Sequence, residues 1–438
     1  MLRRNVEKEL KEYYLNKGES ILILTGARQV GKSYIIRETA KLHFKHYIEI
    51  NLSDDFNGPK YFDGISSVED FYLQISSLYG NNLGNVDDTI IFLDEIQTYP
   101  QLITLLKALK IDGRYRYIAS GSLLGITLKS TFIPIGYIRE VKLHPLSFKE
   151  FLVARGVSLE VIDSLKASFE DKTSISLPLH KVILRYFKEY LLTGGLPRAV
   201  DIFISSLNIK LMRDEQNYIY GLYKLDASQY DEMHLLKIRR IYDMLPSYME
   251  NKVKRVKFNE IESKKGSSLL KYQDEFEYLI ASGIVNDVKA VANPKFPLLE
   301  SSSKNLIKLY FNDVGILTDI LYKENINAVL KDDNAINLGS VYETVVAMEL
   351  INSGHELYYF DSKKVGEVDF LINDYSSLSI LPIEVKSGKH FNNFRAIPKL
   401  VDQAGNYKLK EGYVLTNSNE IKREGNLTIM PIYLAMFI

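Results

Sequence analysis

The 438-residue sequence contains no cysteine. Disulfide bonds, thiolate metal sites and cysteine nucleophiles are therefore excluded, and the composition fits the reducing cytoplasm. The seven histidines show no paired ligand spacing, so we expect no zinc site. No apolar run approaches the roughly 18–20 residues of a membrane span, and the charged start lacks the apolar core of a signal peptide. We expect a cytoplasmic protein that does not contact membranes.

The sequence also lacks net charge, because 55 Lys and Arg residues balance 55 Asp and Glu residues. The whole protein is therefore no polycation, and contacts with nucleic-acid phosphates would need a local excess of basic residues. Such an excess exists between Leu235 and Lys271, where we count 10 basic and 4 acidic residues. From residue 335 onward there are 10 basic and 12 acidic residues, which argues against strong nonspecific DNA binding by that part alone.

The most informative motif follows an apolar run at residues 21–24. It matches the phosphate-loop pattern G-x-x-x-x-G-K-[ST] at every position: Gly26-Ala27-Arg28-Gln29-Val30-Gly31-Lys32-Ser33. The strand-like run before it and the helical pattern after it are the context that a nucleotide site needs, whereas an ordinary glycine-rich turn is the alternative. The glycines let backbone N–H groups approach phosphates, and the helix start favours negative charge. Lys32 would reach the β- and γ-phosphates of ATP, and Ser33 would bind Mg²⁺.

A second apolar strand, residues 89–93, ends in the carboxylates of Asp94 and Glu95. Such a run is typical of a parallel strand that is buried on both faces. We expect Asp94 to hold Mg²⁺, directly or through water, and Glu95 to orient or deprotonate the attacking water, because phosphoryl transfer depends on positioning and charge stabilisation. A third strand at 116–120 places Ser120 or Ser122 where a hydroxyl could sense the γ-phosphate. An ordinary polar residue at a strand end is the alternative.

Strands and helices alternate around these motifs. The alternation predicts an α/β domain with a mainly parallel sheet and helices on both faces for residues 1–150. Ser147 and Glu150 form a possible capping box at the start of the next helix. Residues 151–230 follow a helical pattern that breaks at 194–197.

The basic region falls within residues 231–334. Its pattern predicts two helices and then a short strand at 284–290, the outline of a winged helix that could contact DNA. The second helix is expected to begin near Ser267 or Ser268 and to end at Gly283. A helical linker with a solvated basic face is the alternative.

Residues 335–438 hold a second group of candidate functional residues. Glu384 and Lys386 lie two apart on an expected strand, so they point to the same face, and Asp369 on the preceding strand could lie beside them. Two carboxylates and a lysine on one face are costly unless a cation bridges them. We therefore expect Mg²⁺ or Mn²⁺ at Asp369 and Glu384, with Lys386 activating water for phosphodiester attack. A hairpin with exposed charges is the alternative.

Glu343, in an expected helix at 340–351, is a further candidate ligand. In many nucleases a helix glutamate completes such a metal site. However, Ser340 and Glu343 also fit a capping box, in which Glu343 would only satisfy backbone N–H groups. Both interpretations stay open at this point.

Together these motifs resemble the prokaryotic AAA-superfamily ATPases that are fused, through a winged-helix region, to a PD-(D/E)XK nuclease-like domain of uncharacterised function. The resemblance covers nearly the whole chain and rests on residues 25–33, 93–97, 121–122, 143–148, 194–197, 308–315, 366–370 and 383–386. It implies an AAA-type P-loop domain (1–150), a helical lid (151–230), a winged-helix region (231–334) and a restriction-endonuclease-like α/β domain (335–438).

The resemblance also implies that Pro197, and with it Arg198, contacts the nucleotide from the lid; a plain helix break is the alternative. The sequence departs from the family at one position. The family usually has Gly-Arg where this chain has Gly136 followed by Tyr137, and the nearest arginine is Arg139. An arginine finger contributes ~10³–10⁵ in rate, so hydrolysis is expected to be slow or to depend on Arg139.

These observations leave competing functions. The first is an ATP-dependent DNA-processing enzyme, in which ATP binding repositions the winged-helix and nuclease-like parts on DNA. The second is a nucleotide-controlled switch or scaffold with a catalytically silent nuclease-like part, in which ATP sets binding or assembly into homo-oligomers. The missing basic surface and the missing Gly-Arg favour the second. A small-molecule kinase has only the phosphate loop in its favour.

Overall fold

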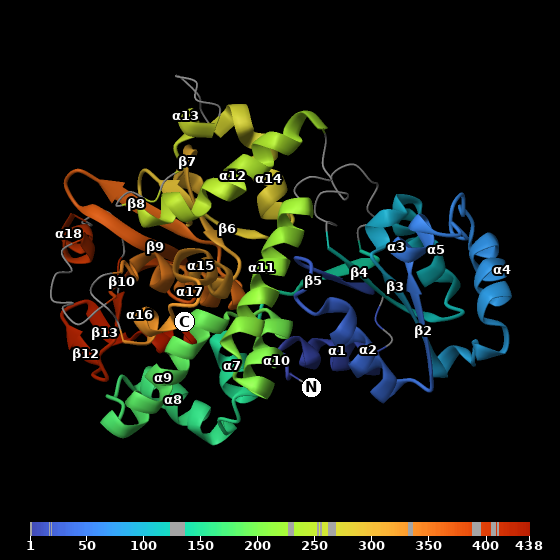
Figure 1. Ribbon diagram of the computed structural model, residues 1–438, viewed down its shortest axis with the longest axis horizontal. Coiled ribbons are helices and arrows are strands. Elements are labelled where there is room, and N and C mark those ends of the chain that lie inside the picture. Colours follow the sequence, from blue (N-terminus) through green and yellow to red (C-terminus); the bar gives the residue numbers. More distant parts are fainter. Residues whose placement is uncertain are drawn as a thin grey trace. The chain divides into compact units, whose positions relative to one another are not determined.

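The computed structural model describes the chain at residues 2–16, 18, 20–122, 136–226, 232–251, 254, 256–261, 269–331, 336–387, 396–403, 409 and 411–438. The chain forms two compact units. The first consists essentially of Arg3–His144, and the second of Pro145–Ile438 apart from Ala281–Gly283. Each unit contains a β-sheet of its own (Figure 1).

The first unit is built on a five-stranded sheet of order β2-β3-β4-β1-β5, in which every neighbouring pair is parallel. Its strands are β1 (Ile21–Thr25), β2 (His46–Asn51), β3 (Thr89–Asp94), β4 (Arg116–Gly121) and β5 (Ile138–Lys142). All residues of β1 and β3 are buried, as expected for apolar strands that helices cover on both sides. The parallel sheet predicted from the sequence is confirmed.

Helices lie on both faces of this sheet (Figure 1). One face packs against α4 (Val68–Tyr79) and α5 (Pro100–Asp112), in a core that also includes α3 (Leu52–Asn57) through its first residue. The other face is covered by α1 (Val6–Leu15) and α2 (Lys32–His43). This arrangement leaves the carboxyl ends of the strands, where the loops carry the candidate site, at one edge of the sheet.

The second unit begins with five helices: α7 (Phe148–Ala154), α8 (Leu159–Asp171), α9 (Leu177–Thr193), α10 (Pro197–Ser206) and α11 (Ile209–Asp226). The predicted capping box is present, because the Ser147 hydroxyl accepts the Glu150 N–H and the Glu150 carboxylate accepts the Ser147 N–H. The predicted break at 194–197 is also found, between α9 and α10.

Further helices follow: α12 (Glu232–Glu250), α13 (Phe258–Ile261), a 3₁₀ turn at Leu269–Tyr272, and α14 (Gln273–Ala281). The helix start predicted at Ser267 or Ser268 falls outside the described residues. Later in the chain come α15 (Val314–Tyr322), α16 (Ile326–Leu330), α17 (Gly339–Asn352), α18 (Ala396–Gln403) and a final 3₁₀ helix at Ile432–Phe437.

The second sheet has eight strands in the order β12-β13-β11-β10-β9-β8-β6-β7. They are β6 (Val285–Val291), β7 (Ser302–Phe311), β8 (Tyr358–Ser362), β9 (Gly366–Asp374), β10 (Ser379–Val385), β11 (Gly412–Thr416), β12 (Lys422–Glu424) and β13 (Leu427–Pro431). β9 and β10 pair antiparallel, as the sequence predicts.

The winged helix predicted in residues 231–334 is not confirmed. β6 pairs antiparallel with β7 and also parallel with β8, so it belongs to the same sheet as the strands of the C-terminal part. In a winged helix, the wing is a short separate hairpin that follows the helices, whereas here the two strands continue into the large sheet. The two strands therefore extend a mixed sheet.

Helix α17 is the central helix of this unit and carries Glu343. All residues from Ser340 to Leu350 are buried, and neighbours include α9, α15, β7 and β10. A helix that is apolar on all sides is expected to be enclosed in this way. Its position fixes the Glu343 carboxylate against the sheet.

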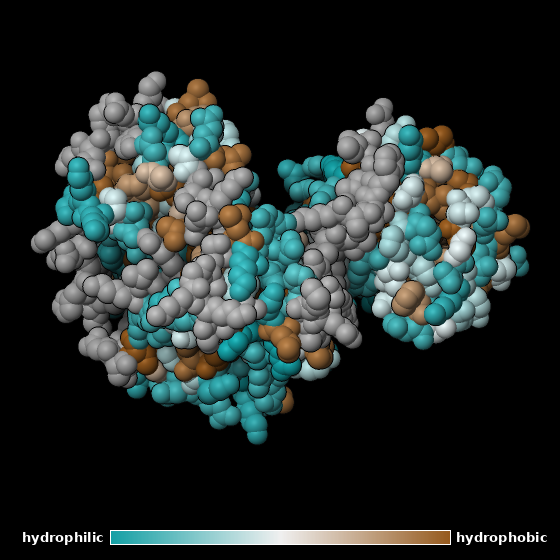
Figure 2. Space-filling model, turned by 90° about the horizontal axis from the view of Figure 1, so that it is seen from above, coloured by the Kyte–Doolittle hydropathy of each residue, from teal (hydrophilic) through white to brown (hydrophobic). Residues whose placement is uncertain are grey.

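The surface is mixed in polarity. On the face shown in Figure 2, hydrophobic residues lie in small groups among hydrophilic ones. Within the described ranges, no helix is long and apolar enough to cross a membrane.

Candidate functional site

The phosphate loop joins the end of β1 to the start of α2, in a conformation that depends on its glycines. Gly26 has φ 138°, and a Cβ there would overlap the carbonyl oxygen of Leu143. Gly31 has φ 93° and is the N-cap of α2. Only glycine adopts such angles without strain, so the backbone can curl around an anion. Lys32, only 5% exposed, folds back and donates to the carbonyls of Gly26 and Ala27, both at 2.9 Å.

Ser33 and Asp94 meet beside this loop. The Ser33 hydroxyl, in the first turn of α2, donates to Asp94 Oδ1 at 3.0 Å. Asp94 ends β3, and Ser120 near the end of β4 donates to the same oxygen. Burial raises the pKa of Asp94, while the hydrogen bonds from Ser120 and Ser33 oppose that shift. A hydroxyl and a carboxylate side by side are the oxygen donors that Mg²⁺ takes, so these residues fit the ion.

Glu95 stands one residue beyond the strand, in a left-handed conformation with φ 54°. Its carboxylate accepts the Gln97 amide at 2.6 Å and the Ser122 hydroxyl at 2.7 Å. Burial on its own would raise the pKa of Glu95, but the Lys32 ammonium and these hydrogen bonds bring it below the ordinary value. Glu95 is therefore an ionised, oriented carboxylate.

The sequence predicts a sensing role for Ser120 or Ser122, and in the structure the two serines hold different carboxylates. Ser120 contacts Asp94, and Ser122 contacts Glu95. Sensing of the γ-phosphate stays a prediction. Gln97 was not singled out as a functional residue, although it stands only two residues after Glu95, and its contact with the carboxylate depends on the turn that follows β3.

Arg4 is a second residue that sequence reasoning missed. It is 8% exposed and donates to the carbonyl of Val30 in the phosphate loop at 3.1 Å, and to the carbonyl of His144 at 2.7 Å. An arginine near the chain start gives no local signal of this role, because both partners are distant in the sequence. Arg139, the arginine nearest to the position of the missing Gly-Arg pair, lies exposed on β5, and its part in hydrolysis stays a prediction.

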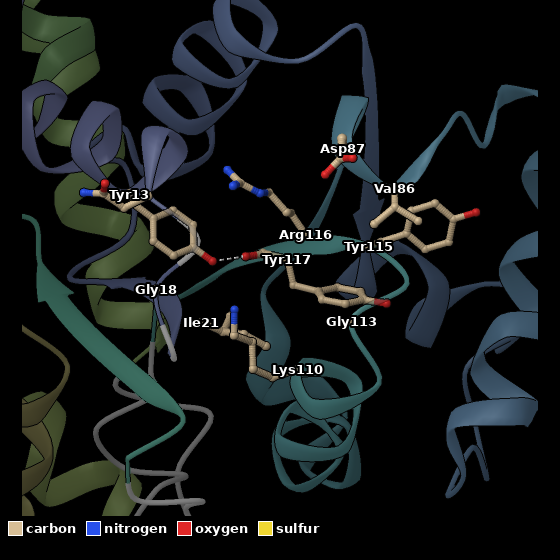
Figure 3. Close-up of a pocket in the computed structure, with 11 residues that line it drawn as sticks. Tyr13, Gly18, Ile21, Val86, Asp87, Lys110, Gly113, Tyr115, Arg116 and Tyr117 are labelled. Carbon is tan, nitrogen blue, oxygen red and sulfur yellow. Dashed lines mark hydrogen bonds between the residues drawn. The ribbon is translucent and has the colours of Figure 1, made fainter.

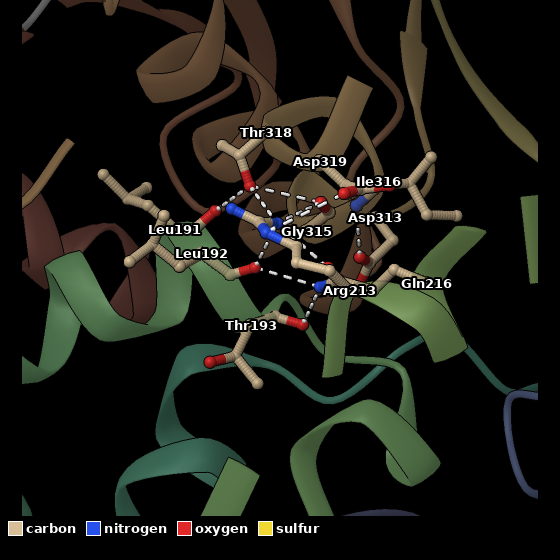
Figure 4. Close-up of polar contacts among 10 residues, drawn as sticks. All are labelled: Leu191, Leu192, Thr193, Arg213, Gln216, Asp313, Gly315, Ile316, Thr318 and Asp319. Carbon is tan, nitrogen blue, oxygen red and sulfur yellow. Dashed lines mark hydrogen bonds and ion pairs between the residues drawn. The ribbon is translucent and has the colours of Figure 1, made fainter. Parts of the chain in front are cut away.

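The Gly-Gly-x-Pro segment contacts other parts of the second unit. The Asp313 carboxylate accepts the Gly195 N–H at 2.6 Å and the Ile316 N–H at 3.1 Å, so it holds the segment and caps α15. Burial raises the pKa of Asp313 to about 6, against the effect of these N–H groups. Nearby, the buried Arg213 of α11 donates to the carbonyls of Leu192 and Gly315 (Figure 4).

Pro197 occupies the first turn of α10, a position that proline favours because its ring presets the helical angle. Arg198 pairs with Glu215 at 3.2 Å. A contact of Pro197 or Arg198 with nucleotide stays a prediction, while the contacts of Gly194 and Gly195 give the segment a structural role within the second unit.

The C-terminal cluster brings together the predicted residues on one face. Glu384 follows the last register pair of β9 and β10, Ile383 with Phe370, so it stands opposite Asp369. The Val385 N–H donates to Asp369 Oδ2 at 2.8 Å. Burial, and then the negative charge of Glu343, raise the pKa of Asp369.

Glu343 does not form the predicted capping box. The N-cap of α17 is Leu338 without a side-chain cap bond, and Ser340 donates instead to Glu250 at 2.8 Å. The helix begins at Gly339, two residues earlier than an N-cap at Ser340 requires, so Ser340 lies within the first turn. Glu343 instead bonds with Lys254 and accepts the Tyr310 hydroxyl at 2.9 Å.

Lysines pair with three carboxylates in and beside this cluster. Lys254 pairs with Glu343, Lys308 with Glu367, and Lys386 with Glu384, the last at 2.6 Å. Both oxygens of Glu343 are thus hydrogen-bonded to protein groups. Within the described ranges, no three His, Cys, Asp or Glu residues are grouped so that they could hold a metal ion. As arranged here, the cluster does not fit the divalent ion predicted at Glu343, Asp369 and Glu384.

A cavity of about 180 Å³ opens elsewhere in the first unit (Figure 3). Ile21 and Arg116, which line it, are the first residues of β1 and β4. In parallel strands this is the edge opposite the phosphate loop. The cavity is therefore separate from the candidate nucleotide site.

Three segments of the chain match known protein families. Residues 18–152 match the family described as AAA domain. Residues 184–327 and 338–435 match two families described as domains of unknown function, DUF8612 and DUF4143. No curated protein sequence matches the chain.

Several solved structures show a weak similarity to this chain. The Walker-type ATPase PABY2304 of Pyrococcus abyssi is 15% identical, over 76% of this chain and 96% of that one, with a TM-score of 0.45. The RuvB Holliday junction branch migration motor of Thermotoga maritima is 16% identical, over 69% and 91%, with a TM-score of 0.29. The Orc1 protein of Aeropyrum pernix, solved in complex with DNA, is 14% identical, over 76% and 93%, with a TM-score of 0.29.

The family match and the geometry of the loop agree about the first unit. Residues 18–152 form an AAA-type P-loop ATPase domain.

Proposed function

We propose that the first unit binds ATP with Mg²⁺ and hydrolyses it, and that the nucleotide state controls the second unit. One observation carries the proposal: Lys32, Ser33, Asp94 and Glu95 meet at the carboxyl edge of a parallel sheet, with the loop backbone curled beside them. Ligands of open α/β sheets bind at this edge.

The loop would bind the phosphates through its backbone N–H groups and the amino end of α2. Lys32 would exchange its two carbonyl partners for phosphate oxygens. That exchange is favourable because it replaces neutral carbonyl acceptors with negatively charged phosphate oxygens, which attract the ammonium more strongly. The side chain is already placed within the loop, so it needs only a small rotation.

Ser33 and Asp94 would hold Mg²⁺, which neutralises charge on the phosphates when it is bound. Glu95 would orient a water molecule toward the γ-phosphorus. As that water attacks, its oxygen bonds to phosphorus, the bond to the ADP oxygen breaks, and Glu95 accepts the proton. A carboxylate with a lowered pKa is ionised at neutral pH and available for this step.

Phosphate release from ATP tests this proposal. We expect steady release by the purified chain with Mg²⁺, and none after EDTA treatment. Lys32→Ala is expected to lose both ATP binding and release, because the loop loses its phosphate-binding ammonium. Lys41→Ala, in the last turn of the same helix, serves as the matched control. Equal rates in the wild type and Lys32→Ala would refute ATP hydrolysis at this loop.

For the second unit, the lysine pairs favour a switch whose nuclease-like site is silent as built. Metal-dependent DNA processing is the second candidate, and it is favoured by the placement of Glu384 opposite Asp369 with Lys386 two residues beyond. Both candidates use ATP to change contacts with DNA or with another copy of the chain.

DNA incubation separates the two candidates. Linear, circular and branched DNA would be mixed with the chain and Mg²⁺ or Mn²⁺, with ATP, ADP or no nucleotide. We expect DNA binding or particle size to depend on the nucleotide, without cleavage. Cleavage that disappears in Lys386→Ala would instead establish the nuclease. Equal affinity and equal size in all nucleotide states would refute the switch.

A further inference from the structure

We propose that the ammonium of Lys254 occupies the cation position of the C-terminal cluster, so that a divalent ion can bind beside Glu343 and Asp369 only after Lys254 withdraws. This inference rests on the metal-dependent candidate under the proposed function, and it adds Lys254, which is not among the predicted site residues. The observations concern one unit of the chain only.

The cluster contains more carboxylates than ammonium groups paired with them. Glu343, Asp369 and Glu384 are three carboxylates, and two ammonium groups, those of Lys254 and Lys386, pair with two of them. The Lys308–Glu367 pair is neutral within itself. Asp369 accepts a backbone N–H from Val385. Among the described residues it forms no ion pair of its own, whereas Glu343 and Glu384 each have one.

One carboxylate oxygen of the cluster is buried without a partner among the described residues. Glu384 is only 4% exposed, and its Oε2 has no hydrogen-bond partner among the described residues. A buried carboxylate oxygen without a partner costs free energy. Its position opposite Asp369 points to a missing cation on this face of the sheet. Glu343 stands on α17, which packs against β10, so the helix brings a third carboxylate toward this part of the sheet. With Lys254 in place, the three carboxylates are not grouped as metal ligands among the described residues.

Lys254 excludes that ion by direct competition. Its Nζ bonds to Glu343 Oε1, while Tyr310 donates to Oε2, so the ammonium already occupies the position at Oε1 that a cation would take. A carboxylate that ligates Mg²⁺ must approach the ion to about 2.0–2.1 Å. An ammonium hydrogen-bonded to the same oxygen and a doubly charged ion cannot share that space, both for steric reasons and because of charge repulsion.

The three lysines differ in how they are held. Lys308 is 1% exposed within β7, and Lys386 directly follows β10. Lys254 lies between α12 and α13 and keeps 14% of its side chain exposed. The nearby backbone is attached to β7 through the Val256 N–H and the Ile307 carbonyl at 3.3 Å. Lys254 lies outside the sheet, so its side chain can rotate away from Glu343 without disruption of the sheet.

Direct measurement of Mn²⁺ binding tests the proposal. The full chain, free of nucleotide and DNA, would be titrated with Mn²⁺ while free Mn²⁺ is followed by electron paramagnetic resonance. At the cluster, we expect Lys254→Met to bind one Mn²⁺ per chain that the wild type binds at least tenfold more weakly. The stoichiometry therefore rises by one at Mn²⁺ concentrations between the two Kd values. Adding Glu343→Gln to Lys254→Met is expected to abolish the gain. Lys254→Arg keeps the cation and is expected to behave as the wild type.

Lys257→Met is the matched control, because that lysine is 54% exposed and, among the described residues, pairs with Glu260 and not with the carboxylates of the cluster. Equal Mn²⁺ binding by the wild type and Lys254→Met would overturn the proposal, whether both bind or neither does. If Lys254→Met does not fold, as judged by thermal unfolding, Lys254→Gln takes its place with the same two outcomes. Because no nucleotide and no DNA are present, the result is independent of whether the chain hydrolyses ATP or acts on DNA.

Discussion

Glu95→Gln is expected to slow ATP hydrolysis by about 10²–10⁴-fold while ATP still binds. Glutamine keeps the size of the side chain and can still accept a hydrogen bond from Ser122, but it cannot take a proton from water. The phosphate loop and the Ser33–Asp94 pair stay intact, so ATP affinity is expected to remain within a fewfold of the wild type. Phosphate release and fluorescent-nucleotide binding, measured on the same samples, check both parts.

The surface variant Glu69→Gln is the matched control, because that carboxylate lies on α4 and is 73% exposed. It is expected to hydrolyse ATP at the wild-type rate. Gln97→Ala tests the hydrogen bond that orients Glu95, and a smaller loss is expected because the base itself remains. Should Glu95→Gln retain wild-type turnover, Glu95 is not the base, and another group must activate the water.

The first unit could be predicted well because its signals are local. Gly26 and Gly31 predict the positive φ angles of the phosphate loop, because other residues adopt such angles only with strain. The apolar runs of β1 and β3 predict buried parallel strands. Asp94 and Glu95 belong to the same short segment as their strand. What this reasoning could not supply was the contact of Arg4 with Val30, because 26 residues separate the two and nothing around Arg4 marks it.

The second unit was harder to predict because its decisive contacts are long-range. Two helices followed by strands fit a winged helix locally, yet β6 also pairs with β8, which lies some 70 residues further along the chain. The capping-box pattern at Ser340 and Glu343 is likewise a local fit. The ion pair of Glu343 with Lys254 spans 89 positions and has no local signature. Such pairings depend on which elements meet in the folded sheet.

The positions of the glycines in the Gly-Gly-x-Pro segment lead to the second large effect. Gly194 ends α9 with φ 68° and ψ −162°, a combination that is essentially restricted to glycine. A Cβ at this position would overlap the Asp313 carboxylate. Asp313 is fully buried, and it holds both the Gly195 N–H and the first turn of α15. Gly194→Ala would therefore strain the backbone and displace a buried cap together.

We expect Gly194→Ala to lower the free energy of unfolding of the second unit by about 1.5–5 kcal/mol. Backbone strain of this kind costs ~1–3 kcal/mol, and loss of a helix cap costs ~0.5–2 kcal/mol. Domains are stable by only about 5–15 kcal/mol, so much of the margin would be lost. Urea unfolding followed by circular dichroism measures the change.

Gly221→Ala is the matched control. Gly221 lies inside α11, and an added Cβ would meet nothing within 4 Å. Alanine is favoured over glycine in a helix by roughly 0.5–1 kcal/mol, so this variant is expected to be as stable as the wild type or slightly more so.

A double-mutant cycle of Gly194→Ala with Asp313→Ala identifies the cause of the lost stability. If the overlap with Asp313 is responsible, the double variant loses clearly less stability than the sum of the two single losses. Strict additivity would mean that Asp313 does not cause the loss, and an unaltered Gly194→Ala protein would mean that the segment tolerates a side chain by shifting away from α15.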